Sequence, residues 1–155
     1  MEHAFLIANW ANYLLQALFV ALVLAASRRW GAPAARLAAL VNVAAWTVTS
    51  GFGLLPLPET VAVWVVCALD LMTAAAFLYV AGRYNSLWIT AAVLAQGVQA
   101  GIDVIYIGQG SGFDRIHHFL FGAVENIFTY AIQAAILGAV LADRRRLAHE
   151  GGVRV

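Results

Sequence analysis

The sequence predicts an all-α membrane protein, a polytopic bundle of five transmembrane helices. Of the 155 residues, 63% are apolar and only 11% are charged, whereas soluble domains average about 45–50% and 25%. Five apolar stretches each hold about 20 residues, the length that crosses a hydrocarbon layer of about 30 Å at 1.5 Å per residue. Because these stretches are continuous and do not alternate with polar residues, a transmembrane β-barrel is excluded.

Each stretch ends at a charge or a turn signal. Arginines follow the first, third and fifth stretches, two prolines follow the second, and a glycine-rich segment follows the fourth. The first stretch is expected to be a retained span, because it is longer than the core of a signal peptide and no positive charge precedes it. The expected spans are Phe5–Ser27, Leu37–Leu55, Val61–Gly82, Leu87–Ile107 and Phe119–Ala142. We therefore expect a transmembrane domain over 1–142 and a cytoplasmic Arg-rich tail over 143–155.

The distribution of arginine predicts the orientation. All nine basic residues are arginines, and only Arg115 falls on the side opposite to the other eight. Since cytoplasmic loops carry the excess of positive charge, the N-terminus is expected outside and the C-terminus in the cytoplasm. The expected location is a bacterial inner membrane, with several passes. A net charge of +1 without a basic stripe argues against nucleic acid as a partner.

Polar side chains recur on one face of every span. In the first span they stand at i, i+3, i+4 and i+7, which is a single helix face. Five such faces turned inward predict a polar cavity that opens outward or sideways and is closed toward the cytoplasm. A dry core of interhelical hydrogen bonds is the alternative. The residues expected to line the cavity are Asn9, Asn12, Gln16, Trp46, Gln99, Tyr106, Asn126, Thr129 and Tyr130.

Three carboxyl groups, those of Asp70, Asp103 and Glu125, fall inside expected spans with no Arg or Lys at their depth. Each charge would cost about 2.5–3.5 kcal/mol at the centre of a spanning helix. The groups must therefore be protonated, bound to a cation or in contact with water. A neutral acid can donate a proton and a neighbouring ionised acid can accept one, so these three are the candidate catalytic residues. The alternative is a protonated side chain that serves only as an interhelical hydrogen-bond donor.

Two other patterns carry less weight. His117 and His118 offer a weak alternative for a metal site at the outer rim, although adjacent histidines are more often a polar flank of a span. Gly97-x-x-x-Gly101 is typical of a close helix crossing. No motif for a cofactor occurs, so no cofactor is expected.

Three classes of function follow from these features. The first is a pocket that binds a hydrophobic small molecule or processes it by acid–base chemistry, as a membrane-embedded isomerase, cyclase or hydrolase with paired carboxylates. The second is a cation or proton channel that uses the same carboxylates in series. The third is a non-catalytic subunit of an inner-membrane complex or a phage-type lysis pore. The expected partners are membrane lipids, the small molecule, and further copies or subunits in the membrane.

Overall fold

The structure, a computed structural model, describes residues 2–53, 55–109 and 115–151, with only the backbone described for 2–9, 53, 59–60, 109, 115–121 and 150–151. Within these residues, every regular element is an α-helix, which confirms the all-α prediction. The helices are α1 (Glu2–Trp30), α2 (Pro33–Gly53), α3 (Glu59–Tyr84), α4 (Leu87–Gln109) and α5 (Arg115–Gly151).

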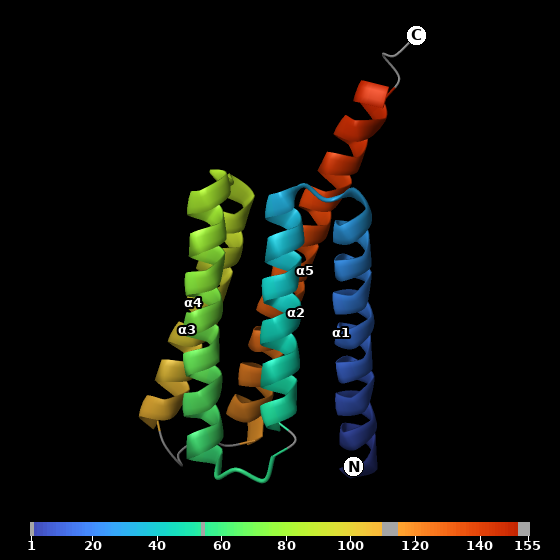
Figure 1. Cartoon of the computed structure of the whole chain (residues 1–155). Coiled ribbons are helices and arrows are strands. Elements are labelled where there is room, and N and C mark those ends of the chain that lie inside the picture. Colours follow the sequence, from blue (N-terminus) through green and yellow to red (C-terminus); the bar gives the residue numbers. More distant parts are fainter. Residues whose placement is uncertain (1, 54, 110–114, 152–155) are drawn as a thin grey trace.

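The five helices stand side by side and alternate in direction (Figure 1). Helices α3 and α4 form a hairpin, α1 packs against α2 and α5, and the central pair α2 and α5 joins these two parts. Every arginine with a described side chain lies at the end where α1 and α3 finish and α2 and α4 begin, which we name the Arg-rich end: Arg28, Arg29, Arg36, Arg83, Arg144, Arg145 and Arg146. The other end is named the opposite end.

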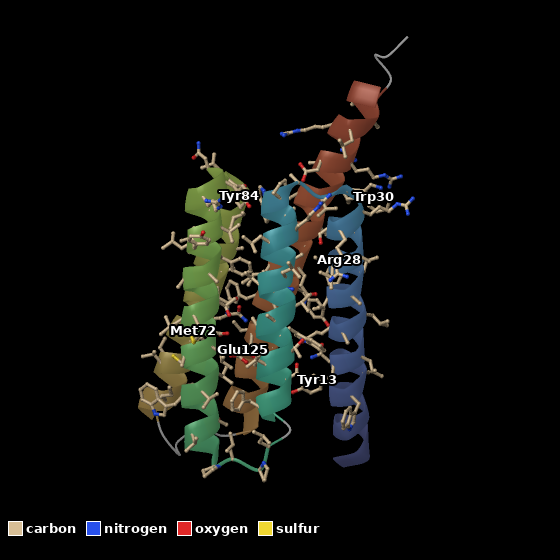
Figure 2. The ribbon with its side chains drawn as sticks, viewed as in Figure 1. Tyr13, Arg28, Trp30, Met72, Tyr84 and Glu125 are labelled. Atoms are coloured by element: carbon tan, nitrogen blue, oxygen red, sulfur yellow. The ribbon has the colours of Figure 1, made fainter. Side chains whose placement is uncertain are left out.

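Four of the helices are long and apolar enough to cross a membrane, which indicates a multi-pass membrane protein. The spanning segments are Trp10–Trp30, Val61–Tyr84, Leu87–Gly108 and Gly122–His149. Helix α2 is not among them, and it carries Arg36 near its start and Asn42 at its middle. Large apolar side chains cover the outside of the bundle; Met72 on α3, for example, is 68% exposed (Figure 2). Such a surface suits contact with lipid rather than with water.

Short turns at the Arg-rich end set the neighbouring helices antiparallel. The turn from α1 to α2 requires glycine, because a Cβ on Gly31 would lie 2.7 Å from the Ser27 carbonyl oxygen. Pro33 opens α2, a position where its missing N–H is not needed. At the end of α3, Asn85 adopts φ 47° and ψ 51°, a left-handed conformation that asparagine tolerates, and its N–H bonds to Ala81.

The half of the bundle next to the Arg-rich end contains an apolar core. Its side chains come from all five helices and are almost completely buried: Val23, Ala38, Ala39, Phe77, Val80, Ile89, Ala92, Ile132 and Ile136. Helix α5 is also linked to the α1–α2 turn at this end of the bundle. The Asp143 carboxylate accepts a hydrogen bond of 2.8 Å from the Ala32 N–H, and the Arg144 guanidinium lies 4.6 Å from the centre of the Trp30 ring.

Two expectations about helices differ from the structure. The expectation of a close helix crossing at Gly97 and Gly101 is wrong within this chain, since a Cβ built on either glycine meets nothing within 4 Å. Both glycines lie on the exposed side of α4. Helix α5 also continues beyond Ala142, the expected end of the fifth span, and runs to Gly151. The basic residues after Ala142 can remain helical because they project past the other helices (Figure 1).

Candidate functional site

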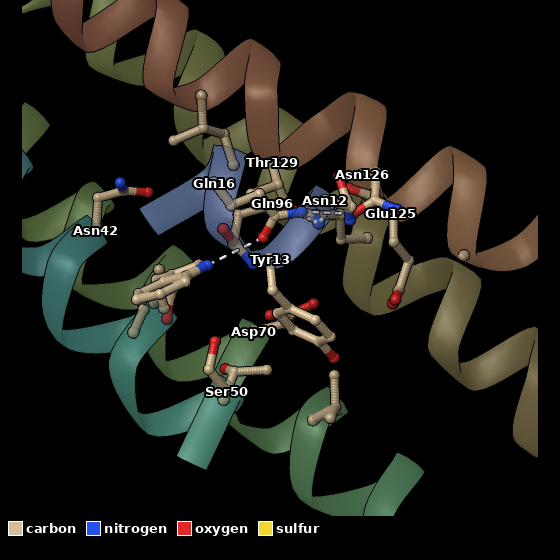
Figure 3. A pocket seen from close by; sticks show the side chains of 18 residues that line it. Asn12, Tyr13, Gln16, Asn42, Ser50, Asp70, Gln96, Glu125, Asn126 and Thr129 are labelled. Carbon is tan, nitrogen blue, oxygen red and sulfur yellow. Dashed lines mark hydrogen bonds between the residues drawn. The ribbon is translucent and has the colours of Figure 1, made fainter. Parts of the chain in front are cut away.

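A cavity of about 310 Å³ lies between the helices, from the opposite half to the middle of the bundle. All five helices contribute to its wall, and most of the lining side chains are polar (Figure 3). The wall is formed by Asn12, Tyr13, Gln16, Asn42, Ala45, Trp46, Thr49, Ser50, Val66, Asp70, Thr73, Gln96, Gln99, Gly122, Glu125, Asn126, Thr129 and Ile132. Tyr13 is 47% exposed, so the cavity reaches the outer surface of the bundle beside α1.

A chain of hydrogen bonds builds the α1 side of the cavity. The Asn126 side-chain oxygen accepts hydrogen bonds from Asn12 at 3.1 Å and from Gln16 at 2.6 Å. Gln16 in turn accepts one from the Trp46 indole N–H at 3.0 Å, and Asn12 accepts one from the Tyr130 hydroxyl at 2.9 Å. These bonds join α1, α2 and α5. They satisfy the amide groups within the chain and hold the wall in one arrangement.

Three carboxyl groups meet at the α3–α4–α5 side of the cavity, which we name the carboxyl cluster. Oxygens of Asp70, Asp103 and Glu125 all lie within 4.8 Å of one another. Asp70 and Glu125 line the cavity, whereas Asp103 is completely buried. The Gln96 side chain is a hydrogen-bond partner of Asp70, and Gln99 fixes the α5 backbone by donating to the Glu125 carbonyl oxygen at 3.2 Å.

Asp103 determines the chemistry of the cluster. Neither of its oxygens has a hydrogen-bond donor in the part of the chain that the structure describes, although Asp70 and Glu125 both lie at hydrogen-bonding range. Two carboxyl oxygens at that range need a proton or a cation between them. Three ionised groups would repel one another by about 3.5 kcal/mol per pair at 4.8 Å and an effective dielectric constant of about 20. The cluster therefore holds shared protons or a bound cation.

The structure brings most of the sequence-predicted site residues together. The residues that line the cavity are Asn12, Gln16, Trp46, Asp70, Gln99, Glu125, Asn126 and Thr129. Tyr130 instead supports the wall through Asn12 and stacks on Phe19, and Tyr106 is buried without lining the cavity. The side chains of Asn9, His117 and His118 lie outside the described residues.

Further lining residues were not among the predicted ones. Asn42, Gln96 and Thr73 complete the polar wall, and each of them stands on a polar face that helical spacing reveals. The apolar members Val66 and Ile132 give no such signal, because their side chains resemble those of any lipid-facing position. Asn42 is 8% exposed and its amide nitrogen has no hydrogen-bond partner among the described residues, which leaves an unpaired donor on a residue that lines the cavity.

Comparison with known proteins adds no family to this description. No protein-family model matches the chain, and neither a curated protein nor a solved structure matches it. The function must therefore be argued from the cavity and its side chains.

Proposed function

We propose that the chain is a five-span protein of a bacterial inner membrane, with the Arg-rich end in the cytoplasm. In this proposal helix α2 is the fifth span, because it runs along the length of the bundle and packs against α1, α3 and α5. Its polar residues Asn42, Trp46, Thr49 and Ser50 lower its apolar character, but they face the cavity rather than lipid. The positive-inside rule supports the orientation.

Fusions test this topology. A fluorescent protein attached after Val155 should be bright, because it folds in the cytoplasm, and alkaline phosphatase at the same place should be inactive. The reverse activities are expected for reporters placed in the segment between α2 and α3. A reporter in the α1–α2 turn should behave like the one after Val155. If it instead behaved like the reporter between α2 and α3, α2 would not cross the membrane and the proposal of five spans would be wrong.

We further propose that the cavity binds a small molecule and that the carboxyl cluster moves protons to and from it. The observation that carries this proposal is the position of three carboxyl oxygens, from three helices, within 4.8 Å at a polar cavity. A neutral carboxyl group in the cluster donates its proton to one alkene carbon of the ligand, which leaves positive charge on the other alkene carbon, and an ionised carboxylate removes a proton from the allylic carbon next to that charge. The double bond shifts, no proton is gained or lost overall, and the reaction is an isomerisation.

The walls favour a ligand with a polar or unsaturated end and a hydrophobic remainder. A volume of about 310 Å³ is at the small end for ligand pockets, so the cavity holds the reacting end of a molecule rather than a long chain. The exposed Tyr13 marks where the cavity reaches the side of the bundle. A hydrophobic tail can leave there and remain in the lipid, which supports a lipid-like substrate.

The two alternatives fit the cavity less well. A channel through the chain would have to pass the apolar core at the Arg-rich end, where Val23, Phe77 and Ile136 are fully buried. A purely structural subunit would present its polar faces to neighbouring proteins. Here Asn12, Gln16 and Asn126 instead bond to one another inside a single chain.

Deuterium transfer tests the proposed chemistry. Membranes that contain the protein are incubated in D2O, and the extracted lipids are analysed by mass spectrometry for deuterium bound to carbon. The wild-type chain should label one class of molecule, because each proton donated from the cluster then comes from solvent. Glu125→Gln should reduce the labelling rate by about 10² or more, since the amide cannot exchange the proton.

The control for this experiment is Asp143→Asn, which removes a carboxyl group at the Arg-rich end and leaves the cluster intact. This variant should label as the wild type does. Acid–base processing by the cluster would be contradicted if the wild-type chain gave no labelling, or if the wild type and Glu125→Gln gave equal labelling.

A further inference from the structure

The carboxyl cluster lacks a positively charged partner among the side chains that the structure describes. Asp103 is 0% exposed, and among the described side chains only Asp70 and Glu125 lie at hydrogen-bonding range of its oxygens. Both of these neighbours are acids themselves. A buried anion needs a positive partner, and every arginine with a described side chain lies at the Arg-rich end.

We propose that Asp70, Asp103 and Glu125 form a binding site for a divalent cation of the Ca²⁺ class, which enters in exchange for protons. The site uses carboxyl groups of the proposed function but goes beyond it, because the cation binds without a substrate. Three helices supply one ligand each, so the bound cation also joins α3, α4 and α5 near the middle of the bundle.

The tolerance of Ca²⁺ for irregular geometry favours it over Mg²⁺ at this cluster. Calcium lies about 2.3–2.6 Å from about six to eight oxygen ligands in a flexible arrangement, whereas magnesium, at about 2.0–2.1 Å, demands a near-ideal octahedron. The upper limit of 4.8 Å on the oxygen separations admits either ion. The choice of Ca²⁺ therefore rests on three protein ligands that come from three separate helices and form an irregular set.

The type of ligand atom supports the same class of cation. The three ligands are all carboxylate oxygens. The one sulfur nearby, that of Cys67, is directed at the Ala100 carbonyl oxygen at 3.8 Å. Sites made of oxygen alone prefer Ca²⁺, Mg²⁺ and Mn²⁺ to Zn²⁺ or Cu²⁺.

Charge balance couples the cation to protons. With no cation, the buried cluster is neutral when all three carboxyl groups are protonated. With a divalent cation bound, it is neutral when a single proton remains. Each cation that enters therefore releases up to about two protons, and the affinity rises as the pH is raised because the ligands must be ionised to bind.

Calorimetry on the full chain tests the site. The protein is reconstituted in nanodiscs of phosphatidylcholine, a lipid without net charge, and titrated with CaCl₂ in two buffers that differ in ionisation enthalpy. We expect one Ca²⁺ per chain with a Kd between about 10⁻⁵ and 10⁻³ M, and a heat that differs between the buffers because protons are released. Asp103→Asn should weaken binding by about tenfold or more, because it removes a ligand charge.

Asp143→Asn is the matched control, since it changes the same functional group outside the cluster, and its Kd should equal that of the wild type. Thermal unfolding of each variant verifies that it is folded. The inference is overturned if the wild-type chain shows no saturable Ca²⁺ heat up to about 5 mM, or if Asp103→Asn binds as tightly as the wild type. If deuterium transfer persisted in either case, only the cation site would be rejected and the proposed acid–base function would still hold.

Discussion

Replacing Asp103 by leucine should make the protein more stable and, at the same time, inactive. Leucine has the same branching as aspartate, but it contains no polar atom. The buried carboxyl group has no hydrogen-bond partner among the described residues other than the acids Asp70 and Glu125, so its removal from a site without exposure to solvent relieves a desolvation penalty of about 1–3 kcal/mol. We expect a higher unfolding temperature in detergent and no deuterium transfer.

Gln99→Leu provides the contrast for this prediction. Gln99 lies one turn before Asp103 on α4 and is similarly buried, but it donates hydrogen bonds to the Glu125 carbonyl oxygen and to the Thr129 hydroxyl, both at 3.2 Å. Its replacement should lower the unfolding temperature because acceptors are left unpaired. If Asp103→Leu also lowered it, Asp103 would be a structural hydrogen-bond donor and both proposals for the cluster would lose their main support.

Phe77→Ala should cause the largest loss of stability of any single truncation in the bundle. Among the side chains that the structure describes, Phe77 is the largest fully buried one, and it packs in the apolar core. Truncation leaves a void that the packed helices cannot fill, which costs about 3–5 kcal/mol of unfolding free energy. Unfolding in mixed micelles with increasing dodecyl sulfate measures the difference.

The neighbouring residue supplies the control. Leu78 is 61% exposed on the outside of α3, so Leu78→Ala removes contacts with lipid rather than with protein and should change the unfolding free energy by less than about 1 kcal/mol. Equal losses for the two variants would mean that the Arg-rich half is not a close-packed core.

The helices could be predicted from the sequence because their signals are local. Continuous apolar runs with arginine, proline or glycine at their ends place all five helices within a few residues of the observed bounds at most ends. The exception is the end of α5, which hydropathy places at Ala142 although the helix reaches Gly151. A hydropathy pattern reports where a chain leaves lipid, and a helix can continue into water.

The site was predictable in part, for a related reason. Helical spacing reveals which polar residues share a face, and most of those predicted to line the cavity do so. Spacing does not reveal the rotation of one helix against another. That rotation places Asp103 behind Asp70 and Glu125, puts Tyr106 inside the packing, and leaves Gly97 and Gly101 on the exposed side of α4.

Helix α5 connects the two ends of the molecule mechanically. Near its start, Glu125 and Asn126 lie in the cavity wall. Nearer its end, Asp143 accepts a hydrogen bond from the α1–α2 turn and Arg144 lies over the Trp30 ring. The last turns project beyond the bundle (Figure 1). A continuous helix transmits tilt along its whole length. A tilt imposed on the projecting segment would thus also displace the side of the cavity that Glu125 and Asn126 form.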